Sequence, residues 1–334
     1  MSRHVFVLII TLLTFYSCSV ENSERPDSTG KGSEVLIVCD KSYWNSAIGD
    51  TIKAVMGAYL PAMNDAEKEF SLINVPYSKF STSLQKHRNV LVIDISKDYT
   101  SPKIETSENV WSRPQRVIKM LLPDANSFFT LFEQRKATIK ELFNKNERAR
   151  FSAENALNPN PQIQNAVRKK FGIEMQFSKD YFISKSDTNK IWIRKETQEM
   201  GQGILIFTYP YKDQKQVDLK NIFDTIEAVQ KRFIPGPTDG SYMKLAFNHV
   251  EPFTQLIQFN NRYTTVTRGL WETHGDFMGG PFINYNVVDE KNARIINFFG
   301  YVYFPNKEKR NNIRQLDAII NTANFDKPVK SNPK

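Results

Sequence analysis

The run Val35-Leu-Ile-Val-Cys39 is short and continuously apolar, which is typical of a β-strand buried on both faces of a sheet. Apolar residues then recur at steps of three and four over residues 44–59, and this spacing predicts a helix. Residues 70–75 and 90–95 have the composition of two further strands, with a short helix predicted between them at 80–86. This alternation of strands and helices predicts a small α/β layer with some parallel pairing.

The first half of the chain ends in a long predicted helix. Residues 116–121 predict one more strand of the same layer, and a helix then begins near Asp124 and extends to about residue 157. The run Asn158-Pro-Asn-Pro161 interrupts this pattern, and we place a domain boundary there. A further helix is predicted over residues 162–171 and ends at Gly172.

The second half has a different pattern, in which short strand-like segments return several times between two helices. Strands are predicted at 173–177, 181–184, 190–194, 204–209, 264–271, 282–288 and 294–304. Helices are predicted at 219–233, with Asp218 as the N-cap, and at 310–322. The predicted class is therefore α+β. It has a small α/β layer with buried strands in the N-terminal half, and an antiparallel sheet with helices packed on one face in the C-terminal half.

The first eighteen residues predict export and a lipid anchor. Arg3 precedes an apolar run over residues 5–16, which suits a secretory signal and is too short to span a bilayer as a helix, which takes about 20 residues. Ser17 is the small residue that lipoprotein processing requires before a lipidated cysteine, so Cys18 is the expected lipidation site. The two residues before Ser17 are bulky, and an ordinary cleaved signal or an uncleaved anchor remain alternatives.

These features divide the sequence into five expected segments. They are a lipoprotein signal peptide at 1–17, a flexible tether at 18–33, an N-terminal α/β domain at 34–160, a C-terminal α+β domain at 161–326, and a disordered tail at 327–334. No aspartate directly follows Cys18, so we expect the outer membrane rather than the inner one. The face of that membrane stays open.

The charge of the chain narrows the classes of partner. The 45 Lys and Arg residues exceed the 36 Asp and Glu residues, which gives a formal net charge of +9. The basic residues are dispersed and the expected compartment is the envelope, so nucleic acid is not an expected partner. The expected partner is the membrane, through the lipid anchor, with envelope proteins or anionic envelope polymers as further candidates. A solvated basic surface without a partner is the simpler alternative.

Most sequence signatures of catalysis are absent. The sequence has no His-Glu-x-x-His pair of zinc ligands, no Walker loop, no Gly-x-Ser-x-Gly elbow and no Cys-x-x-Cys pair. Cys39 ends an apolar strand and is expected to pack as a small hydrophobic residue. No cofactor is expected.

One stretch stands out, Arg268-Gly-Leu-Trp-Glu-Thr-His-Gly-Asp-Phe-Met-Gly-Gly-Pro-Phe282. Glu272, His274 and Asp276 alternate along it, so in a strand they would share one face, where they could hold a divalent metal or act as acid and base. Together with Arg268 and Trp271 they form the candidate ligand-binding set. The alternative is architectural: a polar outer face runs into a glycine-rich turn while Trp271 packs inward.

A second loop, residues 234–243, is also rich in Gly and Pro. It would lie near the first stretch if the two strand–helix units of the C-terminal half pack together. Turn formation is the expected role of both loops.

The lipoprotein-like start, the opening GSEVLIVCDKSYWNSAIGDTIKAVM at 32–56 and the segment TRGLWETHGDFMGGPF at 267–282 resemble a family of Bacteroidetes envelope lipoproteins. That family is known as domain of unknown function 4837. The resemblance covers nearly the whole chain, and its most specific part is the second segment. It implies an envelope location and one shared architecture, but no activity, cofactor or catalytic residue.

The expected function is therefore that of a lipid-anchored envelope protein that binds or scaffolds. A metal-dependent hydrolase centred on Glu272, His274 and Asp276 is the enzymatic alternative. A third interpretation is a subunit of a larger envelope machine, which an exposed apolar patch would favour.

Overall fold

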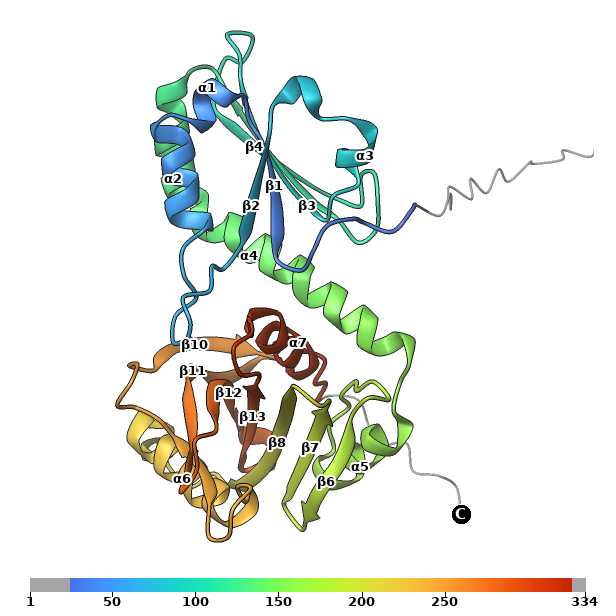
Figure 1. Cartoon of the computed structure of the whole chain (residues 1–334), viewed down its shortest axis with the longest axis vertical. Helices are drawn as coiled ribbons and strands as arrows, with labels where there is room; N and C mark the ends of the chain where they lie inside the picture. The colour runs from blue at the N-terminus through green and yellow to red at the C-terminus, as the bar shows by residue number, and fades with distance from the viewer. Residues whose placement is uncertain (1–24, 326–334) are drawn as a thin grey trace, which may run out of the picture.

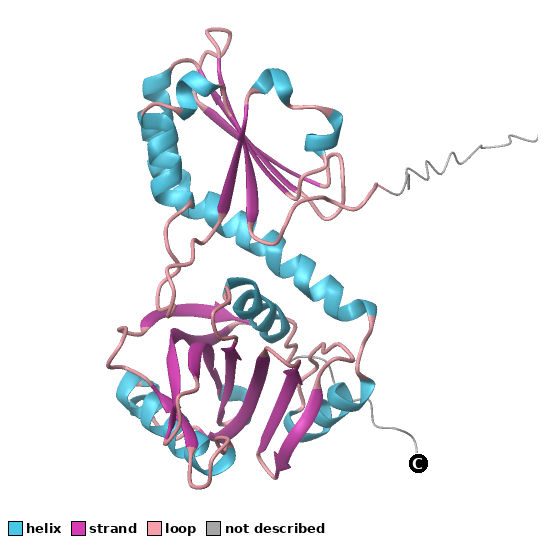
Figure 2. Cartoon of the chain, in the orientation of Figure 1, coloured by secondary structure: helices cyan, strands magenta, loops and turns pink. Residues whose placement is uncertain are grey.

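The computed structural model describes residues 25–325 and arranges them in two domains (Figure 1). We call residues 25–157 the N-terminal domain and residues 158–325 the C-terminal domain. Each domain combines a sheet with helices (Figure 2), so the mixed α+β class is confirmed. The predicted signal peptide, Cys18 and the tail at 327–334 lie outside the described residues. Between residues 25 and 325, no helix is long and apolar enough to cross a membrane.

The N-terminal sheet has the strand order β2-β1-β3-β5-β4. Its strands are β1 (Glu34–Val38), β2 (Ser71–Val75), β3 (Asn89–Ile95), β4 (Lys103–Glu108) and β5 (Arg116–Leu122). The pairs of β1 with β2, β1 with β3 and β3 with β5 are parallel, whereas β4 is antiparallel to β5. All four residues from Val35 to Val38 are fully buried, which confirms that the apolar run is a strand covered on both faces.

Helices and loops cover both faces of this sheet. The helices are α1 (Lys41–Trp44), α2 (Ala47–Met56), α3 (Thr82–Gln85) and α4 (Ala125–Leu157), with a 3₁₀ turn η1 (Tyr77–Lys79). The helix predicted over 44–59 is two helices, because the Ser46 hydroxyl accepts a hydrogen bond from the Ile48 backbone N–H at 3.3 Å and starts a new helix there. Cys39 is buried at the end of β1, as expected, and burial raises the pKa of its thiol to about 11.

Helix α4 links the two domains. Asp124 caps its N-terminus by accepting from the Ser127 backbone N–H at 2.9 Å. Phe128, Phe132, Ile139 and Phe143 of its first half pack against the N-terminal sheet. Its second half continues beside α7 (Arg310–Asn321) of the C-terminal domain, as Figure 1 shows.

The C-terminal domain is built on one antiparallel sheet with the strand order β10-β11-β12-β13-β8-β7-β6, and β9 pairs with the end of β11. The strands are β6 (Phe182–Asp187), β7 (Lys190–Glu196), β8 (Gly201–Pro210), β9 (Tyr242–Leu245), β10 (Phe253–Phe259), β11 (Arg262–His274), β12 (Gly279–Asp289) and β13 (Arg294–Tyr303). The remaining helices are α5 (Pro161–Phe171) and α6 (Leu219–Phe233), with 3₁₀ turns η2 (Gln214–Val217) and η3 (Glu290–Asn292).

Helices lie on both faces of this sheet rather than on one. Side chains of α5 and α7 share a core with Ile283, Val287 and other alternate residues of the strands, and α6 packs with the intervening residues such as Phe282 and Phe299. Two consecutive residues, Phe282 and Ile283, thus belong to different cores, as the period of two in a strand requires. We call the two sides the α7 face and the α6 face.

Some predicted elements differ from the structure. Residues 173–177 form an irregular segment rather than a strand, with one isolated bridge from Glu174 to Asn324. Asp218 precedes α6, but its side chain makes no capping hydrogen bond. Strands β4, β9 and β10 were not predicted. β4 has the sequence Lys-Ile-Glu-Thr-Ser-Glu at the edge of its sheet, where few side chains are buried, so it carries little apolar signal.

The tether predicted at 18–33 is packed on the N-terminal domain from Asp27 onward. Asp27 and Thr29 form β-bridges with Arg113 and His87. The Ser28 hydroxyl donates to the Pro114 carbonyl oxygen at 2.8 Å. This segment is ordered by hydrogen bonds rather than by apolar burial, which is why its polar composition predicts a flexible chain.

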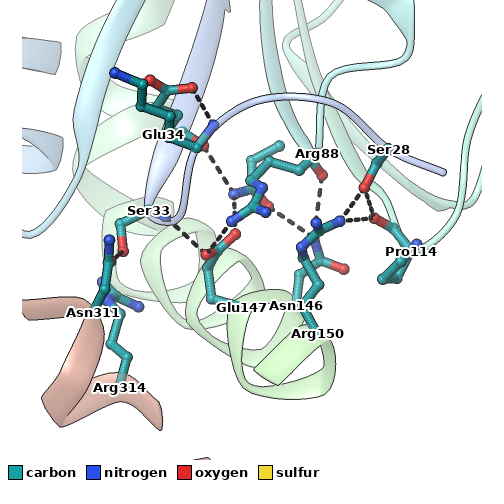
Figure 3. Close-up of polar contacts among 12 residues, drawn as sticks. Ser28, Ser33, Glu34, Arg88, Pro114, Asn146, Glu147, Arg150, Asn311 and Arg314 are labelled. Atoms are coloured by element: carbon teal, nitrogen blue, oxygen red, sulfur yellow. Dashed lines mark hydrogen bonds and ion pairs between the residues drawn. The ribbon is translucent and has the colours of Figure 1, made fainter. Parts of the chain in front are cut away.

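A polar network beside this segment joins the domains (Figure 3). Glu147 of α4 is fully buried, and its carboxylate accepts from the Ser33 backbone N–H at 2.8 Å, from Arg88 at 2.9 Å and from Asn89 at 2.9 Å. The Ser33 hydroxyl in turn donates to Asn311 of α7 at 3.0 Å. The buried carboxylate is therefore fully paired, which is the condition under which such a charge is tolerated.

A second contact fixes α7 against the N-terminal domain. The carboxylate of Glu67 accepts from the backbone N–H groups of Lys309 and Arg310, at 2.8 and 2.7 Å. These N–H groups lie at the start of α7, where a negative charge also interacts favourably with the positive end of the helix dipole. Arg314, one turn further on, donates to the Glu69 backbone carbonyl at 3.0 Å. Loop and helix thus hold the two domains in one arrangement.

Candidate functional site

The three residues predicted to act together are engaged with different partners. Glu272 lies in β11 opposite Lys244 of β9, and the Lys244 ammonium contacts its carboxylate at 2.7 Å. His249 contacts the other oxygen of Glu272 at 3.5 Å. The hydrogen bond from Lys244 lowers the pKa of Glu272, and the nearby His249 adds to this effect. Glu272 is thus an ionised member of a cross-strand ion pair.

His274 and Asp276 do not join this pair. The His274 ring packs on the Tyr242 ring with centroids 4.8 Å apart. Strand β11 ends at His274, and Gly275, with a φ of +81°, turns the chain, so Asp276 no longer shares the strand face. The Asp276 carboxylate accepts from the Phe277 backbone N–H at 2.6 Å instead. Within residues 25–325 no group of three His, Cys, Asp or Glu side chains is placed to hold a metal ion.

The glycines of this hairpin have two distinct roles. Gly275 provides the left-handed conformation at the turn, which side chains rarely adopt. Gly279 and Gly280 have no such conformation. A Cβ atom at Gly280 would lie 2.1 Å from the Val302 carbonyl oxygen, so this glycine is required by the close approach of β12 to β13.

Trp271 leads to a cavity on the α6 face. The cavity has a volume of about 580 Å³. Its lining comes from the β6–β7–β8 edge, from the loop after α6 and from the β11–β12 hairpin. Its lining residues include Trp192, Arg194, Trp271, Tyr301, Tyr303 and Met278. We call this the aromatic pocket.

Hydrogen bonds and ring contacts fix the walls of the aromatic pocket. The Trp192 indole N–H donates to the Tyr301 hydroxyl at 3.0 Å, and the Trp271 indole N–H donates to the Val302 carbonyl oxygen at 3.1 Å. The rings of Trp271 and Tyr301 meet edge to face with centroids 5.4 Å apart. Burial raises the pKa of Tyr301 to about 12, so its hydroxyl is neutral at physiological pH.

The two glycine-rich loops of the sequence meet at this pocket. Residues 234–237 line it beside Thr273 and Met278 of the hairpin. The Thr238 hydroxyl donates to the Gly275 carbonyl oxygen at 3.3 Å, which joins the loops directly. The predicted proximity of the two loops is confirmed.

Charged side chains of both signs stand at the pocket. The Arg194 guanidinium lies over the Trp192 ring, 4.6 Å from its centroid, and forms an ion pair with Glu196. Lys185 and Glu199 also line the pocket. Two basic and two acidic side chains therefore balance each other, and the pocket has no excess of either charge.

A belt of polar side chains crosses the same sheet face beyond the Phe282 and Phe299 rings. Thr265 and Thr267 of β11 lie opposite Asn286 and Asn284 of β12, and Asn286 lies opposite Asn297 of β13. All five are at most 1% exposed. Several of their atoms have no hydrogen-bond partner among residues 25–325: Thr265 Oγ1, both amide atoms of Asn284, Asn286 Nδ2 and Asn297 Oδ1.

Unpaired polar atoms in such number are unusual in a protein interior. A buried group left without a partner costs about 1–3 kcal/mol, and folded proteins usually meet such groups with ordered water or with a ligand. Gln230 of α6 is also fully buried, with both of its amide atoms unpaired among the described residues. The α6 face thus has hydrogen-bonding capacity that the fold itself does not use.

Sequence reasoning identified only part of this site. Trp271 was a candidate and lines the pocket, whereas Trp192, Arg194, Tyr301 and Tyr303 were not identified. The period-two spacing of Trp192 with Arg194, and of Tyr301 with Tyr303, could have placed each pair on one strand face. Arg268, the remaining candidate, points to the opposite face and lines a different cavity.

Comparisons with known families divide the chain as the domains do. Residues 160–322 match the family model described as Domain of unknown function (DUF4837), and residues 28–156 match the model described as Domain of unknown function (DUF8532). The resemblance of the segment at 267–282 to the first family is thus supported. The opening segment at 32–56 lies within the second family instead, so the expected coverage of nearly the whole chain by the first was too wide. No curated protein matches the chain.

Proposed function

We propose that this protein is a lipid-anchored envelope protein that binds a small, ring-shaped ligand without net charge in the aromatic pocket. The observation that carries the binding function is the pocket itself. A cavity of about 580 Å³ is within the range of small-molecule sites, and two tryptophan and two tyrosine side chains line the part of its wall that lies on the sheet. Such side chains offer ring faces and edges to a ring-shaped ligand.

The charge around the pocket favours a neutral ligand. Arg194 and Glu196 already neutralise each other, so a charged ligand would have to break that pair. Their polar atoms remain available to the hydroxyl or amide groups of a neutral molecule. Saccharide rings and neutral aromatic rings share this chemistry, and the experiment below separates them.

The proposed location rests on the sequence alone. The short apolar run at 5–16, the small residue Ser17 and the following Cys18 support processing as a lipoprotein. Labelling cells with a tagged fatty acid tests this proposal. We expect label on the wild type and none on Cys18→Ala, and equal labelling of the two would contradict it.

Isothermal titration calorimetry tests the binding function, with chitobiose as the saccharide and 2-naphthol as the aromatic probe. The chain from Ser19 onward is suitable, because it contains every described helix and strand. We expect one of the two probes to bind, and failure of both would contradict the proposal.

A pocket-filling variant supplies the control. Gly201 lines the pocket, and a Cβ atom there would have only the Glu196 side chain near it, at 3.9 Å. Gly201→Leu should therefore fill the cavity without straining the fold and weaken probe binding by about tenfold or more. Gly201→Ala should leave binding close to that of the wild type. Unchanged binding to Gly201→Leu would place the probe elsewhere.

A further inference from the structure

A second cavity lies between the domains, on the α7 face of the C-terminal sheet. Its volume is about 830 Å³. One wall is formed by α4 and by the chain after α2, and the other by β10, β11 and α7. We call it the interdomain cleft. Ligand sites occur preferentially at such domain boundaries.

Arg268 is the unusual residue of this cleft. It is half-buried in β11, and no hydrogen bond or ion pair connects its guanidinium to any residue within 25–325. A guanidinium has five N–H donors in a planar fork, and in proteins it is always charged. Arg268 therefore brings an unused positive charge and unused donors into the cleft.

The acidic side chains of the cleft are already paired with other cations. Glu69 contacts Lys140, and Glu141 contacts Arg148. Asp317 accepts from the Tyr285 hydroxyl at 2.6 Å and has Arg148 at 3.9 Å. The described acids of the cleft thus have these other partners, and the Arg268 charge is not compensated.

A second buried cation increases the positive potential next to Arg268. Arg314 lines the same cleft and donates to Asn144 at 2.7 Å. The pKa of Arg314 is lowered to about 10, chiefly by burial, because the charges of Glu147 and Glu69 oppose this shift while those of Arg310 and Arg268 add to it. An anion beside Arg268 would relieve this repulsion between like charges.

The wall formed by β10 carries several apolar side chains, with Gln255 between them. Phe253, Ile257 and Phe259 alternate along β10 and line the cleft together with Val266 of β11. Phe253 is 39% exposed, in the edge strand of the sheet. The cleft therefore offers a guanidinium at Arg268 that is unpaired among the described residues and, beside it, the apolar side chains of β10.

We propose that the interdomain cleft binds an anionic amphiphile, with its carboxylate or phosphate head on Arg268 and its acyl chain along β10. The two N–H donors of one guanidinium edge match the two oxygens of such a head group. The apolar strip of β10 accepts the chain by removing it from water. This site is independent of the aromatic pocket, which lies on the other face of the sheet and takes a ligand of different chemistry.

Calorimetry with three probes separates head from chain. Decanoate carries both parts, inorganic phosphate carries the charge alone, and decanol carries the chain alone. For the chain from Ser19 onward we expect decanoate to bind at least about tenfold more tightly than either of the other two. Equal binding of decanol would overturn the charged head, equal binding of phosphate would overturn the apolar strip, and no binding of decanoate would overturn the site.

Two matched variants assign the charge to its residue. Arg268→Gln should weaken decanoate binding by about tenfold or more, because it removes the charge and the paired N–H donors that hold the carboxylate. Arg232→Gln removes the same charge from the exposed side of α6 and should leave the affinity unchanged. Equal losses in the two variants would reduce the effect to net charge and overturn the proposal. Melting both variants checks that each is folded.

Phosphatidylglycerol and free decanoate distinguish the sources of the ligand. If the cleft takes free acids, an excess of phosphatidylglycerol vesicles should not displace decanoate from the wild type. If it takes lipid head groups, the vesicles should displace decanoate from the wild type. Either result supports the anionic amphiphile, whereas displacement by phosphatidylcholine vesicles to the same extent would contradict it.

Discussion

The two sheets of this protein differ in what they bury. In the N-terminal sheet, residues 35–38 of β1 and 90–93 of β3 are apolar on both faces, and their side chains belong to two hydrophobic clusters. In the C-terminal sheet, β11 and β12 carry Thr265, Thr267, Asn284 and Asn286 at positions that are equally buried. The first sheet has the interior of a structural core, and the second has unused hydrogen-bonding groups and a cavity against each face. We infer that the N-terminal sheet has a structural role and that the C-terminal sheet provides the ligand-binding surfaces.

The largest effect should come from shortening a side chain in the apolar sheet. Leu91 in the middle of β3 is fully buried among apolar neighbours. Leu91→Ala should lower the free energy of unfolding by about 2–5 kcal/mol, because it loses apolar contacts and leaves a cavity. Urea denaturation measures this. A loss below about 1 kcal/mol would show that the N-terminal core is loosely packed.

Replacing one buried asparagine in each sheet sharpens the contrast. Asn89 of β3 donates to the Glu34 carbonyl and to Glu147, so Asn89→Leu should lower the free energy of unfolding by about 1–3 kcal/mol. Asn284 has no partner for either amide atom among residues 25–325, and Asn284→Leu should raise it by about 1 kcal/mol. The same urea experiment compares them. Equal destabilisation by both variants would remove the distinction between the sheets.

The two domains should also lose stability in different pH ranges. Burial lowers the pKa of His87 below 6.5 in the N-terminal domain, against the opposing effects of Asn89 and Glu34. As the pH falls, His87 is therefore protonated in the unfolded chain before it is protonated in the folded one. The stability that neutral His87 contributes is lost as the pH falls below about 6.5. Asp289 in the C-terminal domain is buried, but hydrogen bonds from Asn292, Arg294 and Arg262 outweigh that burial and lower its pKa below 3.8.

The contribution of Asp289 is therefore kept until the pH falls below about 3.8. Melting curves between pH 8 and pH 3, with domain-specific signals, test this order. His87→Gln should remove the loss near pH 6.5 and leave the lower range unchanged. Loss of the C-terminal domain first would contradict the assignment.

The smallest effect is expected at His274. Its ring is exposed and packs on the Tyr242 ring, and its side chain has no hydrogen bond or ion pair with any described residue. His274→Gln should therefore change the free energy of unfolding by less than about 0.5 kcal/mol. Melting with and without added zinc tests the enzymatic alternative at the same time. A zinc-dependent gain in the wild type that the variant lacks would restore a metal role for this residue.

Strands with continuous apolar runs were predictable, and sites built across the chain were not. The strand β1 was predictable from the run Val35 to Val38. A strand that is buried on both faces is apolar at every position, and such a run does not occur in a surface segment. The prediction that Glu272, His274 and Asp276 share one strand face holds only for the first two residues, which lie in β11. The turn at Gly275 ends the strand and separates Asp276 from them. The local sequence does not determine strand order. Strand order decides which side chains contact Glu272, and it places Trp271 and Trp192 in the same pocket.

The protein has four tryptophans, two in each domain. They allow one direct test of the claim that ligand binds to the C-terminal domain and not to the N-terminal domain. Trp44 and Trp111 belong to the N-terminal domain, and Trp192 and Trp271 line the aromatic pocket. Fluorine NMR of the 5-fluorotryptophan protein resolves all four during a titration with the probe that calorimetry selects. Binding in the aromatic pocket should shift the Trp192 and Trp271 resonances with the same midpoint and leave those of Trp44 and Trp111 in place. Shifts confined to Trp44 and Trp111, or no shift at any of the four, would contradict it.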